Sequence, residues 1–367
     1  MTRSTRTPHP RAAGDTRPVL ITGGAGFIGT NLADRLLSSG RRVILFDNLS
    51  RRGVDRHVRW LAARHGDLLS VEEADIRDAR AVRRATREAG QVFHFAAQVA
   101  VTTSLADPVD DFAVNAQGTL NLLEALRGRP DPAPLVFTST NKVYGDLEDL
   151  ELVAEDSRYA PADAAIRRHG VSETRPLSFH SPYGCSKGTA DQYVLDYART
   201  YRTPGVVFRM SCIYGPHQCG SEDQGWVAHF LINAIEGRPI TVYGDGLQVR
   251  DVLFVEDLVE AFLLAQGHMP AISGQPFNMG GGPARTTSLV ELLDHIETLH
   301  GERPEVEFDA WRAADQRYYV SDTRRFAAAT GWQPRVGVQA GLASLYQWLA
   351  DTRTEAPLSE ATTPVLG

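Results

Sequence analysis

Five short apolar runs recur in the first 211 residues, and each is continuous rather than alternating with polar residues. They are PVLIT, RVILFD, QVFHFAAQ, PLVFTST and GVVFRMS, and amphipathic segments such as VNAQGTLNLLEALRG lie between them. A continuous apolar run is typical of a strand that is buried on both faces of a parallel sheet. Strands that alternate with helices through right-handed crossovers form a doubly wound sheet. The sequence therefore predicts an α/β fold with a Rossmann-type doubly wound parallel sheet.

The pattern changes after residue 211. Helical segments (VAHFLINAIEG, VEDLVEAFLLAQ, SLVELLDHIETLHG) now alternate with short β-like pieces, PITVYG and PFNMG. We expect residues 18–211 to form the first domain and residues 212–351 a smaller C-terminal α/β part, with some segments returning to the first sheet. Residues 146–180 form a polar, irregular insertion, and an insertion of this length is usually functional or disordered. The basic, proline-containing arm 1–17 and the tail 352–367 are predicted to be disordered.

The composition excludes several classes of protein. A net charge of −7 argues against a nucleic-acid-binding or membrane-surface protein. No apolar run is long enough to span a bilayer, and the N-terminal arm lacks the apolar region of a secretory signal. The three cysteines, Cys185, Cys212 and Cys219, lack metal-ligand spacing. We therefore expect no metal, and reduced thiols in a cytoplasmic protein.

A glycine-rich turn follows the first predicted strand. In GGAGFIG, Gly23 permits the tight turn, Gly26 lets the backbone approach a pyrophosphate, and Gly29 lets the following helix pack on the strand. The free N–H groups at the start of that helix favour phosphate binding. Asp47 ends the next strand, where a carboxylate accepts hydrogen bonds from the adenosine ribose and repels a 2′-phosphate. The motif predicts NAD rather than NADP, although Arg51 and Arg52 weaken that preference.

Further residues of the cofactor site are expected at the carboxyl ends of the other strands. Asp75 and Ile76 follow the third strand, where they contact the adenine or, alternatively, Asp75 only caps the helix that follows. The small residues after Phe95 would let the cofactor cross the edge of the sheet. The remaining predicted cofactor residues are Phe27, Ile28, Asn48, Ala96, Ala97, Gln98, Asn115 and Thr138.

Tyr183 and Lys187 form a second signal. Only two of the 38 basic residues are lysines, Lys142 and Lys187. Tyr183 and Lys187 are four apart at the start of a predicted helix, so their side chains share one face. A lysine ammonium beside a tyrosine favours the phenolate and lowers its pKa from about 10. The pair therefore predicts a base that takes an alcohol proton while hydride passes to a nicotinamide, and we expect both residues to contact the cofactor.

These motifs resemble those of the extended short-chain dehydrogenases/reductases that act on nucleotide sugars, over residues 18–351. The resemblance implies that Thr140, in TSTNKVYG, completes a Thr-Tyr-Lys triad, with Ser139 as the alternative. Sugar 4,6-dehydratases of this family carry an acid beside the triad threonine, whereas this chain has Asn141 and Lys142. Dehydration is therefore disfavoured and redox epimerisation remains. Lys142 is expected either to touch substrate or to be structural.

Longer stretches resemble the C2-epimerases of CDP-linked deoxyhexoses within this family. They include STNKVYGDLEDLE, FHSPYGCSKG, SEDQGWV, QVRDVL and RAADQR. UDP-sugar 4-epimerases, the alternative, commonly carry asparagine where Cys212 stands. The resemblance implies a nucleotide-diphosphate sugar, with CDP favoured, and a homodimer. It also implies the substrate residues Thr140, Asn141, Lys142, Cys212, Gln224, Trp226, Arg250 and Arg312, the two arginines for the diphosphate.

Two functions of other classes remain as alternatives to an epimerase. A dehydrogenase or reductase would release NADH and would therefore need an exchangeable cofactor. A non-enzymatic NAD sensor would need no activated phenolate, and the intact Thr140, Tyr183 and Lys187 argue against it. His94, at the end of a buried strand, is interpreted as a core histidine.

Overall fold

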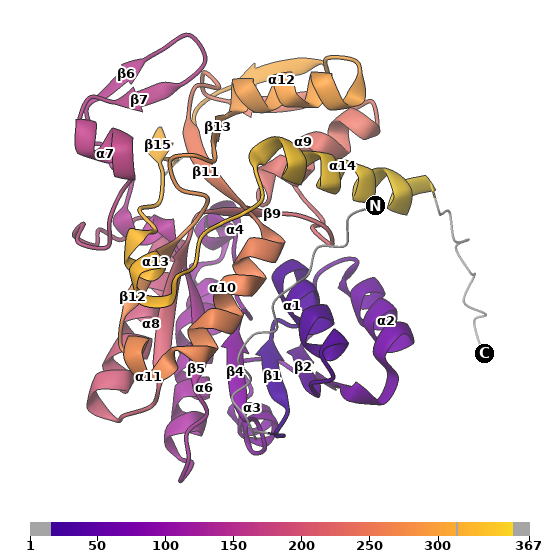
Figure 1. The fold of residues 1–367 in the computed structure, drawn as a ribbon, viewed down its shortest axis with the longest axis vertical. Coiled ribbons are helices and arrows are strands. Elements are labelled where there is room, and N and C mark those ends of the chain that lie inside the picture. The colour runs from indigo at the N-terminus through magenta and orange to yellow at the C-terminus, as the bar shows by residue number, and fades with distance from the viewer. Residues whose placement is uncertain (1–15, 313–314, 355–367) are drawn as a thin grey trace.

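A seven-stranded parallel sheet forms the centre of the computed structural model, which describes residues 16–312 and 315–354 (Figure 1). Its strand order is β12-β8-β5-β4-β1-β2-β3, and every neighbouring pair is parallel. The five apolar runs correspond to β1, β2, β4, β5 and β8, which confirms the predicted doubly wound sheet. The strands are β1 (Val19–Thr22), β2 (Val43–Asp47), β3 (Leu69–Glu73), β4 (Gln91–His94), β5 (Leu135–Thr140), β8 (Gly205–Met210) and β12 (Pro276–Met279).

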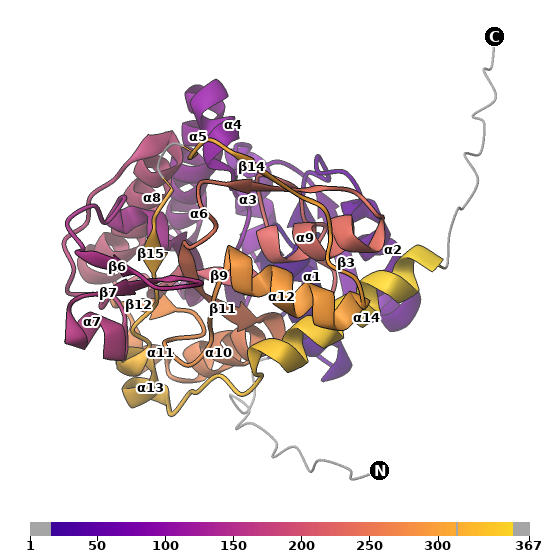
Figure 2. The same ribbon diagram turned by 90° about the horizontal axis from the view of Figure 1, so that it is seen from above.

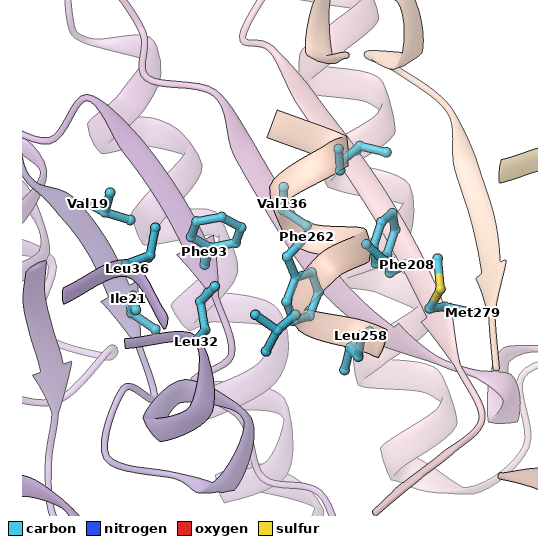
Figure 3. Packing of buried hydrophobic residues seen from close by; sticks show 14 of the residues in the cluster. Val19, Ile21, Leu32, Leu36, Phe93, Val136, Phe208, Leu258, Phe262 and Met279 are labelled. Atoms are coloured by element: carbon cyan, nitrogen blue, oxygen red, sulfur yellow. The ribbon is translucent and has the colours of Figure 1, made fainter. Parts of the chain in front are cut away.

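Helices cover both faces of this sheet, because successive residues of a strand point to opposite sides. On one side Val19, Ile21 and Phe93 pack against α1 (Phe27–Ser38) and α10 (Val255–Gly267), as Figure 3 shows. On the other side Leu20 and Val92 belong to a cluster with α3, α6 and α8. The remaining helices beside the sheet are α2 (Val54–His65), η1 (Gly66–Leu68), α3 (Ala79–Thr86), α4 (Val101–Ala106), α5 (Pro108–Phe112), α6 (Gly118–Arg127), α8 (Ser181–Thr200), α11 (Met269–Ile272) and α13 (Arg324–Thr330).

The sheet reverses its direction of growth between β1 and β4. From β1 the chain continues to β2 and β3 on one side, and from β4 to β5, β8 and β12 on the other. The crevice at the carboxyl ends of two such strands is where open α/β sheets bind ligands. The predicted helical segment VNAQGTLNLLEALRG is not α-helical throughout. A π-helical turn, η2 (Ala113–Gln117), lies between α5 and α6.

The smaller C-terminal part lies above the carboxyl ends of the strands in Figure 1. Its own apolar cluster joins α9, α12 and α14 to two small sheets. One segment of this part, β12, pairs with β8 in the large sheet. Its elements are β9 (Cys212–Tyr214), α9 (Trp226–Ile235), β10 (Ile240–Tyr243), β11 (Val249–Phe254), β13 (Thr286–Ser288), α12 (Leu289–His300), β14 (Val306–Asp309), β15 (Tyr318–Tyr319) and α14 (Val338–Thr354).

The 146–180 insertion is more regular than its sequence suggested. It forms a hairpin of β6 (Leu152–Ala154) and β7 (Tyr159–Pro161), followed by α7 (Ala164–His169), and Figure 2 shows it at one side of the molecule. An ion pair from Arg158 to Glu291 ties the hairpin to the first turn of α12.

The predicted disorder of the two ends concerns mostly residues 1–15 and 355–367, which lie outside the described residues. Residues 352–354 continue α14 instead of beginning the tail. Within the described residues, no helix is both long and apolar enough to cross a membrane.

Candidate active site

A cavity of about 770 Å³ opens at the carboxyl ends of the central strands. Both parts of the chain line it: the glycine turn, β2 and the ends of β4 and β5 from one side, β9 and the start of α9 from the other. Its volume lies within the range of small-molecule sites in proteins. No residue of the 146–180 insertion is among those that line it.

The glycine turn is built as the sequence predicted. Gly23 has a positive φ of 67°, and a Cβ there would lie 2.6 Å from the Ala96 nitrogen. A Cβ on Gly29 would lie 2.6 Å from the Gly23 carbonyl oxygen, so α1 packs directly on the turn. Gly26 lines the cavity, immediately before α1 begins at Phe27, and a Cβ there would meet only the Gly23 oxygen, at 3.2 Å. The turn thus leaves an open face at a helix N-terminus, which suits a pyrophosphate.

Asp47 lies beside this turn. Its carboxylate accepts hydrogen bonds from the Ala25 nitrogen at 3.0 Å and the Leu49 nitrogen at 2.9 Å. Burial raises the Asp47 pKa, and these hydrogen bonds and the positive charge of Arg51 oppose the rise. The side chain is therefore fixed at the rim of the cavity, where a ribose would meet it.

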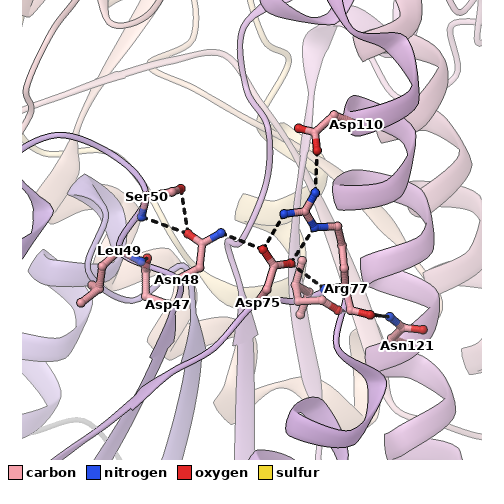
Figure 4. Close-up of polar contacts among 9 residues, drawn as sticks. Asp47, Asn48, Leu49, Ser50, Asp75, Arg77, Asp110 and Asn121 are labelled. Atoms are coloured by element: carbon pink, nitrogen blue, oxygen red, sulfur yellow. Dashed lines mark hydrogen bonds and ion pairs between the residues drawn. The ribbon is translucent and has the colours of Figure 1, made fainter.

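Asp75 belongs to a polar chain along the same rim, which Figure 4 shows. It accepts hydrogen bonds from Asn48 at 2.9 Å and from Arg77, and Arg77 reaches on to Asp110. The bonds from Arg77 hold the Asp75 pKa well below its usual range. The cap of α3 is Asp78 rather than Asp75, so the helix-capping alternative for Asp75 is wrong.

All the other predicted cofactor residues line the same cavity, with the single exception of Asn115. Asn115 lies behind it, where its side-chain oxygen accepts a hydrogen bond from the Gln98 nitrogen at 3.0 Å. The predicted residues that line the cavity are Phe27, Ile28, Asn48, Ile76, Phe95, Ala96, Ala97, Gln98 and Thr138.

Thr140, Tyr183 and Lys187 meet at the floor of the cavity. Tyr183 and Lys187 come from the first two turns of α8, and Thr140 ends β5. A hydrogen bond joins Thr140 to the Tyr183 hydroxyl. The Lys187 ammonium donates to the Thr138 carbonyl at 2.6 Å and lies 4.4 Å from the centre of the Phe137 ring.

The electrostatics of this pair differ from the sequence-based expectation. Burial raises the pKa of Tyr183 to about 12, although the bond with Thr140 opposes the rise. Burial likewise lowers the pKa of Lys187 to about 7, against the negative charges of Asp191 and Asp111. Desolvation disfavours the charged form of both groups, and it is the largest cause of both pKa shifts. Lys187 by itself therefore does not make Tyr183 a phenolate.

Four of the predicted substrate residues line the cavity beside this triad: Asn141, Cys212, Gln224 and Trp226. The indole nitrogen of Trp226 donates to the Cys212 sulfur at 3.3 Å. Asn141 is held by Gln316, at 3.0 Å.

The three predicted cationic substrate residues are not among those that line the cavity. Arg250 and Lys142 approach the same oxygen of Asp315, at 2.7 and 3.8 Å. Arg312 stacks 3.8 Å from the centre of the Tyr243 ring and pairs with Glu222. Their contact with a diphosphate remains a prediction.

Arg51 lines the cavity although the sequence indicated it only as a neighbour of Asp47. Its guanidinium donates to the Gln224 side chain at 2.8 Å, which joins the cofactor side of the cavity to the substrate side. These two residues are 173 positions apart, so no local pattern predicts their contact.

Comparison with known proteins agrees with this geometry. Residues 19–280 match the NAD dependent epimerase/dehydratase family, to which the chain therefore belongs. The chain is 42% identical to CDP-paratose 2-epimerase of Salmonella typhi over 90% of its length and 98% of that protein. It is 34% identical to UDP-glucose 4-epimerase of Mycolicibacterium smegmatis, over 90% and 97% of the two chains.

Solved structures give the same result. UDP-glucose 4-epimerase of Thermotoga maritima, with UDP-glucose, superposes with a TM-score of 0.78 at 30% identity, covering 92% of this chain and 99% of that one. The Thermus thermophilus UDP-glucose 4-epimerase, in complex with NAD, superposes with a TM-score of 0.75 at 33% identity, covering 90% and 98%. The open glycine turn, the fixed Asp47 and the absence of a Cβ at Gly26 fit NAD in this chain.

Proposed function

We propose that this protein is an NAD-dependent epimerase that inverts C2 of a CDP-linked deoxyhexose. The observation that carries the proposal is the position of Thr140, Tyr183 and Lys187 at the floor of a cavity that is continuous with the glycine turn. The similarity to CDP-paratose 2-epimerase over nearly the whole of both chains supports the choice of sugar.

In this proposal the protein first removes the proton of the sugar hydroxyl and later returns it. NAD, when bound, would supply the hydride acceptor, and its nicotinamide ring is positively charged only in the oxidised form. The Tyr183 oxygen, as the phenolate that a positively charged nicotinamide would favour, would take the proton of the sugar hydroxyl, and Thr140 holds the Tyr183 oxygen through a hydrogen bond. The keto sugar would then rotate within the cavity, and Tyr183 would return the proton to the sugar oxygen when the bound cofactor returns hydride to the opposite face.

The residues after Thr140 support epimerisation over dehydration. Elimination of water needs an acid or base beside the sugar carbon that loses its hydroxyl. Here Asn141 is an amide held by Gln316, and Lys142 is paired with Asp315. Neither offers a carboxylate next to Thr140.

Isotope labelling tests the proposal. A CDP-sugar deuterated at C2 should keep its label in the product, because hydride carried by NAD does not exchange with solvent. The same reaction in heavy water should leave C2 unlabelled. Solvent deuterium at C2 would indicate proton abstraction instead, and hydride transfer from C4, or equal turnover of UDP-glucose, would favour the UDP-sugar 4-epimerase. An NADH-releasing dehydrogenase would instead accumulate free NADH with its keto product.

We further propose a cytoplasmic homodimer. Leu105, Val109 and Phe112 on α4 and α5 are more than half exposed, and Tyr193 of the adjacent α8 is 44% exposed. These helices pack together, so their apolar side chains suit burial against a second copy. Val109→Asp should give a monomer by light scattering, whereas Phe308→Asp, at another exposed apolar position on β14, should leave a dimer. Exposed free thiols at Cys185 and Cys219 suit a reducing compartment.

A further inference from the structure

Two buried carboxylates lie behind the Tyr183–Lys187 pair, and the chemistry proposed above uses neither. Asp111 comes from α5 and Asp191 from α8, one turn beyond Lys187, and both are fully buried. Both negative charges act on Lys187 and raise its pKa against the effect of burial. Their surroundings, however, differ.

The charge of Asp191 is balanced by an arginine. Arg209 on β8 donates to both Asp191 oxygens, at 2.9 and 3.0 Å, in the forked geometry that suits a carboxylate. A third bond from Arg209 reaches the Tyr144 hydroxyl at 3.1 Å. Asp191 and Arg209 therefore form a buried ion pair. The negative charge of Asp191 nevertheless acts on Lys187, and more strongly than that of Asp111.

Asp111 has only neutral hydrogen-bond donors. One oxygen accepts from the Ser186 hydroxyl, and the other from the Asn115 side chain at 3.1 Å. Among the ion pairs within the described residues, none includes Asp111. A buried carboxylate without an opposite charge is costly, and the cation that attracts it is Lys187, the residue after Ser186.

We propose that Asp111 is a second counter-ion of Lys187, beside Asp191: a positioning residue that helps to keep the lysine protonated and, through Ser186, fixes the turn of α8 that presents it. The importance of this pair for turnover rests on the proposed function, whereas the coupling between the two charges does not. Ser186 links them directly, because its hydroxyl contacts Asp111, Asn115 and the Tyr183 carbonyl.

The other titratable groups around the pair do not replace Asp111. His94 on β4 is neutral, because burial and the charge of Lys187 lower its pKa to about 3, and two threonine hydroxyls hold its ring. Asp110 faces outward to Arg77. The remaining titratable side chains of the elements packed against α5 and α8 pair elsewhere, at Glu124 with Arg127, Lys142 with Asp315, and Tyr144 with Arg209.

The scarcity of lysine allows a direct test. With only Lys142 and Lys187 in the chain, protein grown on lysine labelled with ¹³C at Cε gives two lysine resonances, and Lys142→Arg identifies that of Lys187. In the full-length, NAD-loaded protein, the pH titration of this resonance reports the Lys187 pKa without any substrate.

Asp111→Asn removes the charge and keeps the shape. We expect the Lys187 titration to move down by about one pH unit, the lower end of the effect of one nearby charge. The matched control is Asp257→Asn, which removes another buried carboxylate that accepts two backbone hydrogen bonds, at Arg335 and Val336. It should leave the Lys187 titration in place. If Asp111→Asn does not fold, Asp111→Ser removes the same charge from a smaller side chain.

An unmoved Lys187 titration in a folded Asp111 variant would overturn the proposal, and so would an equal shift in Asp257→Asn. Turnover gives a second readout. Because the ammonium form is lost as pH rises through the Lys187 pKa, the alkaline limb of activity should move down with it in Asp111→Asn. Full activity of Tyr183→Phe would refute the proposed function instead, and would leave the titration result standing.

Discussion

Replacing Gly29 by alanine tests whether the close contact of α1 with the glycine turn is what permits NAD binding. The new Cβ would lie 2.6 Å from the Gly23 oxygen and 2.7 Å from both Cα and oxygen of Gly24. These are backbone atoms, so no flexible side chain can move aside. Overpacking of this kind costs about 1–3 kcal/mol.

The strain can appear in two ways. If the turn keeps its shape, the free energy of unfolding falls by that amount. If the turn opens, stability is preserved and NAD affinity falls, by about 5- to 150-fold for the same energy. We therefore expect the two losses, measured by urea unfolding of nucleotide-free protein and by calorimetric titration with NAD, to add up to about 1–3 kcal/mol. Gly267→Ala, at the end of α10, places its Cβ in open space and is the control. Unchanged stability together with unchanged NAD affinity in Gly29→Ala would refute the reasoning.

Three further predictions concern Tyr183, Lys187 and the buried Asp191–Arg209 pair. Tyr183→Phe should lower kcat by about 10²–10⁴, as expected for a lost general base, and should leave NAD affinity unchanged; comparable turnover would contradict the assignment. Lys187→Arg should also be severely impaired, because a planar guanidinium cannot occupy the place of an ammonium that donates to the Thr138 carbonyl; near-normal kcat would count against it. Arg209→Met should lower the free energy of unfolding in urea by about 3–5 kcal/mol, because it leaves Asp191 buried and unpaired. The double variant Asp191→Leu with Arg209→Met should recover much of that loss. An equally unstable double variant would argue against charge burial as the cause.

The sequence predicted the parts of the site that depend on local spacing. The turn from Gly23 to Gly29 lies between one strand and one helix, so its conformation follows from neighbouring residues. Tyr183 and Lys187 share a face of α8 because they are four residues apart. In each case the chemistry lies within one turn of regular structure.

Contacts between distant segments could not be predicted in this way. The Arg51–Gln224 bond and the Arg250–Asp315 pair depend on how the C-terminal part lies on the sheet. The insertion is similar, since the ion pair from Arg158 to Glu291 that ties down its hairpin joins residues 133 positions apart. The Tyr183 pKa was expected to fall but is raised by burial, because spacing gives the distance between two groups but not their burial.

Burial of the acid–base pair also bears on how an epimerase keeps its proton. With the Tyr183 pKa near 12 and the Lys187 pKa near 7, the buried pair by itself favours the neutral phenol. A phenolate becomes accessible only when further positive charge lies nearby, as it does beside an oxidised nicotinamide. Once hydride has left the sugar, that charge is gone, and Tyr183 again favours the protonated form. The phenol then holds the proton while the keto sugar turns over, so that the same oxygen can return it. On this argument, a change that lowers the Tyr183 pKa permanently would speed oxidation but slow the return step, and the keto sugar would accumulate.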